Sequence, residues 1–189
     1  MSETAGVKSR PSRPLETMAV VGSFVRISHT LFSLPLVLAG MWIGAGGAPS
    51  WRVFALALLA ATGARTAAMA LNRIIDRRID AANQRTAMRE LPRGALRLWQ
   101  AWLVVTIGTA LYFLGAGLLG RLTLWLSPIP LIVFAGYPFL KRFTALCHFG
   151  VGLALGLAPL GGWVAVTQSF AELLDILPLG VFGLFWVAG

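Results

Sequence analysis

Six apolar runs occupy most of this 189-residue chain and constrain its fold more than any other feature. The runs cover residues 27–43, 53–72, 98–120, 122–137, 149–168 and 176–189. A helix of roughly 20 apolar residues spans a bilayer, and backbone groups in lipid must be paired within helices or closed barrels. The sequence therefore predicts an all-α, polytopic transmembrane helix bundle with about six spans. Gly152 and Gly156 form a G-x-x-x-G pair, which predicts close packing against a neighbouring helix.

The composition excludes an ordinary soluble domain. Hydrophobic residues make up 57% of the chain and charged residues only 12%, against about 25% charged in soluble domains. The net charge of +9 does not indicate a nucleic-acid partner, because no soluble module carries a basic face. The single cysteine, Cys147, excludes an internal disulfide and a cysteine zinc cluster. Residues 1–17 are polar and predict a disordered tail, which leaves residues 18–189 as one transmembrane domain.

The distribution of Lys and Arg predicts the orientation in the membrane. With the N-terminus in the cytoplasm, thirteen of the sixteen basic residues fall on the cytoplasmic side of a six-span bundle. Arg52 and Arg121 are then outside, and Arg65 lies within the second span. The sequence therefore predicts an integral membrane protein with a cytoplasmic N-terminus.

The most charged stretch, residues 72–94, lies between the second and third spans and reads NRIIDRRIDAANQRTAMRELPRG. Asn72, Asp76 and Asp80 are four residues apart, so on a helix they share one face and form a stripe about 12 Å long. The two carboxylates repel each other, and a divalent cation would remove that repulsion. Oxygen ligands of this kind suit Mg²⁺, so the stripe is a candidate metal site.

The same stretch has a second interpretation. Arg73 with Asp76, and Arg77 with Asp80, are opposite charges at i,i+3 and are typical of ion pairs on a solvated helix.

Further basic residues surround the stripe. Arg65 lies two helical turns before Asn72, and we expect it to point into the volume above the stripe rather than to an interface. A second cytoplasmic turn carries Tyr137, Lys141 and Arg142. Carboxylates that hold Mg²⁺, beside cations that neutralise phosphate oxygens, indicate a diphosphate site. At the mouth of an apolar bundle, such a site predicts a lipid diphosphate whose departure is stabilised electrostatically.

Two segments carry a family resemblance. The 72–94 stretch resembles the first Asp-rich signature of the UbiA superfamily of intramembrane prenyltransferases. GARTAAMALNRIID before it and YPFLKRFTALCHFGVGLALGLAPLGGW further on are similar to the 4-hydroxybenzoate polyprenyltransferase branch. The resemblance implies a bundle of about nine spans in the bacterial inner membrane and Mg²⁺-dependent transfer of a polyprenyl group to an aromatic acid, 4-hydroxybenzoate, in ubiquinone biosynthesis. The sequence stops where the family's second Asp-rich motif is expected, which predicts either a fragment of a longer protein or a naturally truncated chain.

The resemblance also implies roles for individual residues. Asn72, Asp76 and Asp80 would act catalytically by binding Mg²⁺ and, through it, the diphosphate. The residues implied in substrate binding are Arg85, Lys141 and Arg142 for diphosphate oxygens, Arg26 and Arg65 for the acceptor carboxylate, and Tyr137. Phe134, Tyr137 and Trp163 are also candidates to face an allylic cation, although plain packing is the favoured interpretation.

Two other functions stay open. One is a member of the same family that acts on a naphthoate, a haem precursor or a chlorophyll precursor. The other is a non-enzymatic membrane transporter or scaffold whose arginines only set topology. The two aspartates in phase with an asparagine favour an enzyme, because a protein that needs only topology has no use for them.

Overall fold

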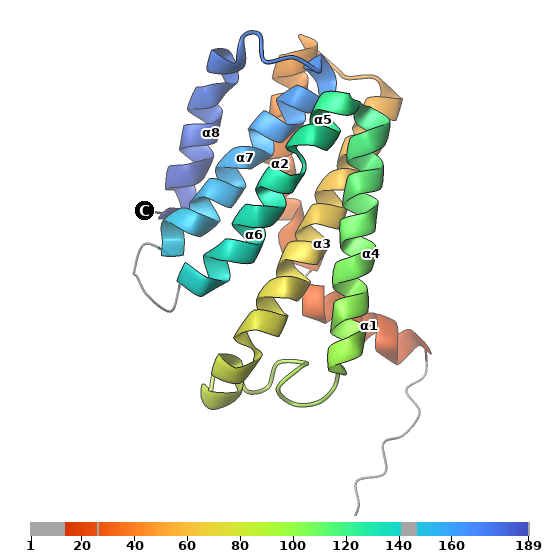
Figure 1. The fold of residues 1–189 in the computed structure, drawn as a ribbon, viewed down its shortest axis with the longest axis vertical. Helices are drawn as coiled ribbons and strands as arrows, with labels where there is room; N and C mark the ends of the chain where they lie inside the picture. The colour runs from red at the N-terminus through yellow and green to blue at the C-terminus, as the bar shows by residue number, and fades with distance from the viewer. Residues whose placement is uncertain (1–13, 26, 141–146, 189) are drawn as a thin grey trace, which may run out of the picture.

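Helices form almost all of the structure, a computed structural model that describes residues 14–25, 27–140 and 147–188 (Figure 1). The helices are α1 Pro14–Val25, α2 Ile27–Ala45, α3 Trp51–Ala82, α4 Leu98–Leu119, α5 Arg121–Leu126, α6 Pro128–Leu140, α7 Cys147–Thr167 and α8 Leu173–Ala188. No strand occurs among these residues. The predicted all-α bundle is confirmed.

Four stretches are long and apolar enough to cross a membrane: Trp51–Ala82, Leu98–Leu119, Arg121–Leu140 and His148–Thr167. Two shorter apolar helices, Leu34–Ala45 and Leu173–Val187, fall where the sequence predicted the first and sixth spans. Every predicted span is thus an apolar helix, and four of them meet the length expected of a full crossing.

The N-terminal tail differs from the prediction. Helix α1 begins at Pro14, so residues 14–17 are helical rather than disordered. Proline is favoured in the first turn of a helix, where its missing N–H costs no hydrogen bond. Residues 1–13 lie outside the part of the chain that the structure describes.

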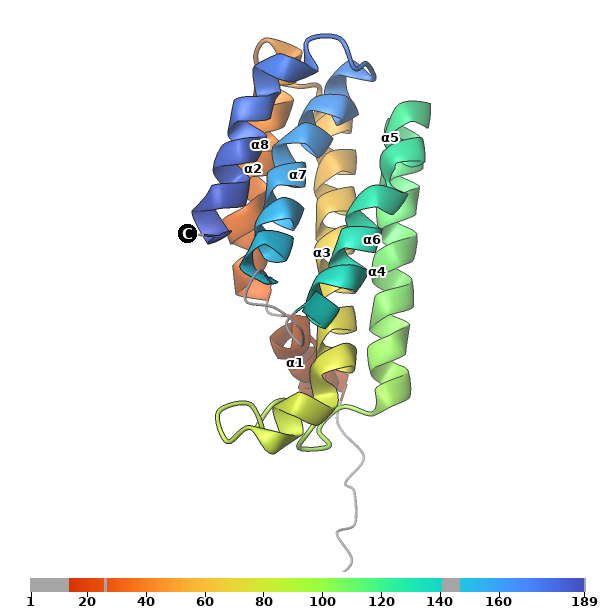
Figure 2. The same cartoon turned by 60° about the vertical axis from the view of Figure 1, so that its left-hand side comes forward.

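Helix α3 is the longest element and extends beyond its neighbours at the end of the bundle where α1 lies (Figure 2). Its N-cap is Ser50, whose hydroxyl oxygen accepts a hydrogen bond from the Val53 N–H at 3.4 Å. At 1.5 Å per residue its 32 residues reach about 48 Å, which exceeds the roughly 30 Å hydrocarbon thickness of a bilayer. One continuous helix therefore carries both a membrane span and the charged residues that follow it.

Glycines bring the helices into backbone contact. A Cβ atom added to Gly63 of α3 would lie 2.7 Å from both the Gly108 carbonyl oxygen and the Tyr112 nitrogen of α4. A Cβ on Gly156 of α7 would lie 2.6 Å from the Gly180 carbonyl oxygen of α8, and one on Gly152 would collide with the Leu184 carbonyl. The close packing predicted from the G-x-x-x-G pair is confirmed.

The charged end of α3 is held by a small hydrophobic cluster. Its buried members are Phe24 and Val25 of α1, Ala70 and Ile74 of α3, Leu96 of the loop and Ala101 of α4. This cluster fastens α1 and the loop between α3 and α4 to the same turns of α3 that carry the Asn/Asp stripe.

The glycine contact between α3 and α4 gives a stability test. We expect Gly63→Ala to destabilise the bundle by about 1–3 kcal/mol, because the added Cβ must push two backbones apart. Thermal unfolding in detergent measures the effect. Gly136→Ala in α6 is the matched control, since an added Cβ there has no atom within 4 Å. Equal melting temperatures for both variants would contradict the close approach of α3 and α4.

Candidate active site

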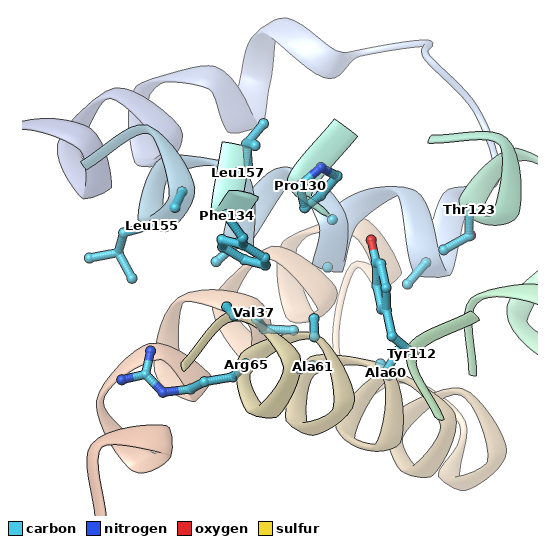
Figure 3. Close-up of a pocket in the computed structure, with 18 of the residues that line it drawn as sticks. Val37, Ala60, Ala61, Arg65, Tyr112, Thr123, Pro130, Phe134, Leu155 and Leu157 are labelled. Carbon is cyan, nitrogen blue, oxygen red and sulfur yellow. The ribbon is translucent and has the colours of Figure 1, made fainter. Parts of the chain in front are cut away.

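A cavity of about 320 Å³ is lined by residues of helices α2 to α8 (Figure 3). Helix α3 contributes an alanine face with members at positions 57, 61, 64 and 68, spacings of four, three and four that match one side of a helix. The stretch of α3 from Ala57 to Met69 that lines the cavity is about 18 Å long. The small alanine side chains leave the space that larger residues would fill.

The polar residues of the cavity separate toward its two ends. Figure 3 shows Arg65 of α3 on one side and Tyr112 of α4 on the other, with Phe134 of α6 between them. Tyr137 also lines the cavity, and its hydroxyl interacts electrostatically with both Asp76 and Arg65. Tyr137 therefore lies near both Arg65, which lines the cavity, and Asp76 of the Asn/Asp stripe.

Both aspartates of the stripe are buried. Asp76 is 7% exposed and Asp80 is 6% exposed, while Asn72, one turn earlier on α3, is half-buried. Two carboxylates withdrawn from water on one helix face need compensation by cations or hydrogen-bond donors. The stripe is thus not the solvated helix face of the alternative interpretation.

The compensation at Asp80 comes from a residue that the sequence did not single out. Arg89 Nη1 donates to Asp80 Oδ1 at 2.8 Å and to Oδ2 at 2.7 Å. Arg77, the partner expected from i,i+3 spacing, donates from Nη1 to the Ile74 carbonyl oxygen instead. Helical spacing does not predict the Asp80–Arg89 pair, because Asp80 belongs to α3 whereas Arg89 lies in the loop that follows it.

The loop after α3 is tied back to the helix and to α1. The Thr86 hydroxyl donates to the Asp80 carbonyl oxygen at 3.0 Å. The Ser23 hydroxyl of α1 donates to Glu90 Oε1 at 2.7 Å, and Arg73 Nη1 lies 4.0 Å from Glu90 Oε2. These contacts hold the loop beneath the stripe.

An open pocket of about 700 Å³ lies within this loop region. Its lining residues are Ser23, Arg73, Arg85, Thr86, Met88, Arg89 and Glu90. Three arginines against one glutamate give the pocket a positive wall suited to anions. Arg85 is exposed here and is not among the residues that line the apolar cavity.

The structure places some of the predicted site residues together and leaves others undescribed. Arg65 and Tyr137 line the cavity, and Asn72, Asp76 and Asp80 continue from it along α3. Arg26, Lys141 and Arg142 lie outside the described residues.

The two remaining aromatic candidates have different surroundings. Phe134 lines the cavity, but Trp163 is buried in a core cluster with Val164 and Ile176, as plain packing predicts.

The donor set of the stripe fits a magnesium ion. In residues 14–25, 27–140 and 147–188 there is no group of three or more His, Cys, Asp or Glu able to hold a metal. Mg²⁺, however, commonly takes only one or two protein carboxylates and completes its shell with water and substrate phosphate. Asp76 and Asp80, both buried and one turn apart, are the two carboxylates that would hold such an ion, and Asn72 would add a neutral oxygen.

Comparison with known proteins decides the family. The model of the UbiA prenyltransferase family matches residues 33–189. The chain belongs to the UbiA family. The 4-hydroxybenzoate octaprenyltransferase of Cupriavidus necator is 31% identical over 167 residues, which are 87% of this chain and 56% of that protein. The enzyme of the same name from Burkholderia ambifaria is 33% identical over 86% of this chain and 53% of its own length.

Solved UbiA structures share the fold. The apo structure of a UbiA homolog from Aeropyrum pernix K1 has a TM-score of 0.79 at 38% identity and covers 86% of this chain and 61% of that one. A UbiA homolog from Archaeoglobus fulgidus bound to GPP and Mg²⁺ has a TM-score of 0.72 at 18% identity, covering 88% and 60%. The chain therefore spans about half to three-fifths of the length of these UbiA relatives.

The Glu90 carboxyl makes the stability of the loop after α3 depend on pH. Burial raises the pKa of the Glu90 carboxyl, but the Ser23 hydroxyl, a backbone hydrogen bond, Arg73 and Arg93 together bring that pKa below its ordinary value. A carboxyl group with a lowered folded-state pKa stabilises the protein above its unfolded-state pKa. That stabilisation is lost as the pH falls through the folded-state pKa.

We therefore expect Glu90→Gln to lower the melting temperature at pH 7 and to have progressively less effect as the pH falls below about 4. Thermal unfolding in detergent between pH 7 and pH 3 measures the difference from wild type. Glu172→Gln, an exposed glutamate at the other end of the bundle, is the control. A difference that stays constant down to pH 3 would show that the Glu90 charge does not hold the loop.

Proposed function

We propose that this protein is a Mg²⁺-dependent prenyltransferase that moves a polyprenyl group from an allylic diphosphate to an aromatic acid, with 4-hydroxybenzoate as the acceptor. The observation that carries the proposal is the continuity of the apolar cavity with a buried, charged stripe on one helix. An apolar tail and an anionic head are the two parts of a prenyl diphosphate. The names of the relatives from Cupriavidus necator and Burkholderia ambifaria support this acceptor.

The cavity would hold the prenyl tail. Its lining is dominated by Ala, Val, Leu and Gly residues, most of them from helices that are long enough to cross a membrane. Burial of an isoprenoid chain there removes apolar surface from water at about 25 cal/mol per Å². A tail in this position points the diphosphate toward Arg65, Tyr137 and the stripe.

The head group would meet the charged end. Asn72, Asp76 and Asp80 are the residues that would hold Mg²⁺, which supplies electrostatic stabilisation to the departing diphosphate. Arg85, with Lys141 and Arg142, would bind diphosphate oxygens. Arg65, with Arg26, would bind the acceptor carboxylate and orient the aromatic ring above the head group.

The reaction then proceeds in three steps. The allylic carbon–oxygen bond breaks and its electron pair leaves with the diphosphate. The ring carbon ortho to the phenol hydroxyl attacks the allylic carbon, and loss of the ring proton restores aromaticity. The apolar cavity would exclude water, which would otherwise capture the allylic cation. Phe134, on the cavity wall, and Tyr137 would face that cation with their rings.

A bacterial inner membrane with a cytoplasmic N-terminus is the setting we propose. In this orientation the loop after α3, with its arginines, lies on the cytoplasmic side, where a soluble aromatic acid has access to it. A non-enzymatic transporter or scaffold is less well supported, since it does not account for two buried carboxylates at i,i+4.

The stripe gives the first functional test. We expect Asp76→Asn to lower the rate of prenyl transfer about 100-fold or more at saturating Mg²⁺, because a buried carboxylate becomes a neutral amide. Radiolabelled transfer to 4-hydroxybenzoate measures the rate. Arg78→Gln, an exposed residue two positions along the same helix, is the control. Near-wild-type turnover of Asp76→Asn would make the stripe purely structural.

Arg65 gives the second functional test. Lysine keeps the positive charge but lacks the planar fork that grips a carboxylate with two hydrogen bonds. We expect Arg65→Lys to raise the KM for the aromatic acid about tenfold, equivalent to about 1.4 kcal/mol, with little change for the prenyl diphosphate. Steady-state kinetics with each substrate varied in turn separate the two. A selective rise in the KM for the prenyl diphosphate would assign Arg65 to the head group instead.

A further inference from the structure

The contact between Arg89 and Asp80 has a consequence for metal binding. We infer that Arg89 and the divalent cation compete for the same carboxylate, so that cation binding at Asp80 displaces the Arg89 side chain. This inference rests on the proposed function, because it assumes that a metal ion binds the stripe.

The geometry of the contact supports competition. A single nitrogen, Arg89 Nη1, lies 2.8 Å from Asp80 Oδ1 and 2.7 Å from Oδ2, so it bridges both oxygens of the carboxylate. The Asp80 side chain is only 8% exposed, whereas that of Arg89 is 30% exposed. The guanidinium therefore covers the accessible edge of a carboxylate that is closed on its other sides.

Electrostatics supports the same conclusion. Mg²⁺ binds carboxylate oxygens at about 2.0–2.1 Å and tolerates little deviation from octahedral geometry. A guanidinium bridging both oxygens would lie beside that ion as a second cation in a partly buried place, where like charges repel more strongly than in water. The accessible edge of the Asp80 carboxylate therefore accommodates either Mg²⁺ or the Arg89 guanidinium, but not both.

The Arg89 side chain can leave the Asp80 carboxylate while the loop after α3 stays in place, because other contacts hold that loop. The Thr86 hydroxyl is bonded to the backbone carbonyl of Asp80, and Glu90 is bonded to Ser23 of α1. Neither contact involves the Asp80 carboxylate. The displaced guanidinium has room in the open pocket, which Arg89 already lines together with Arg73 and Arg85. The exchange therefore moves one side chain and leaves the backbone in place.

Arg89 could instead only orient Asp80 for the metal. In that role, replacing Arg89 would change the metal affinity in the opposite direction. An orienting residue increases metal affinity, and its loss weakens binding by about 10- to 100-fold. A competitor decreases metal affinity, and its loss tightens binding. The sign of the change in affinity separates the two roles.

The experiment measures Mn²⁺ binding to the purified protein in detergent by electron paramagnetic resonance, with Mg²⁺ as the displacing ion. Arg89→Gln is compared with Arg78→Gln, which removes the same charge from an exposed position near the stripe. We expect Arg89→Gln to bind Mn²⁺ about tenfold more tightly than Arg78→Gln, the order of effect of one charge-assisted contact. We also expect Mg²⁺ to raise the melting temperature of Arg89→Gln more than that of either wild type or Arg78→Gln.

Affinity equal to or weaker than that of Arg78→Gln would overturn the competition while leaving the metal site intact. Absence of Mn²⁺ binding to both wild type and Arg89→Gln would overturn both this inference and the proposed metal site. If Arg89→Gln does not fold, Arg89→Met is compared with Arg78→Met. Methionine keeps an unbranched apolar stem but has neither charge nor hydrogen-bond donor, and tighter Mn²⁺ binding by Arg89→Met than by Arg78→Met is then the expected result.

Discussion

Unbroken backbone hydrogen bonding through α3 is the constraint on which the rest of this structure depends. Because each residue of a helix rises 1.5 Å and turns 100°, the helix fixes Arg65, Asn72, Asp76 and Asp80 in relative height and direction without any further contact. The residues that line the cavity and those of the stripe therefore belong to one rigid element. A break between Arg65 and Asp76 would uncouple them.

Close packing supplies the second condition. Lipid gives helices no hydrophobic reason to associate, so contact area and backbone approach decide which faces meet. Glycines at the α3–α4 and α7–α8 contacts bring those pairs together. The alanine face of α3, in contrast, meets the cavity. Small side chains thus bring α3 against one neighbour and leave space on another of its sides.

The sequence predicted what local periodicity determines. The apolar runs gave the helices, and the spacing of Asn72, Asp76 and Asp80 placed them together on α3, as found. The G-x-x-x-G pair likewise marked a true helix contact. The start of α1 at Pro14 was missed, because a proline-containing polar segment reads as a tail until its helix is seen packed against α3.

Contacts between distant segments could not be predicted in the same way. Arg89 reaches Asp80 around the end of a helix, and Ser23 reaches Glu90 from another helix. In the sequence Arg89 counted only toward the topology, and Arg73 was a candidate partner of Asp76, whereas the structure places it 4.0 Å from Glu90. The apolar cavity was equally hidden, since it is lined by residues of seven helices whose mutual packing no single segment specifies.

The alanine face of α3 makes the length of the cavity independent of the chemistry at its charged end. Ala57 lies two helical turns from Arg65 along the cavity wall, so a larger side chain at that position would shorten the cavity from its far end. The charged end would be unchanged. If the cavity holds a prenyl tail, the length of chain it accepts can change one methyl group at a time, while the chemistry of the head group stays constant.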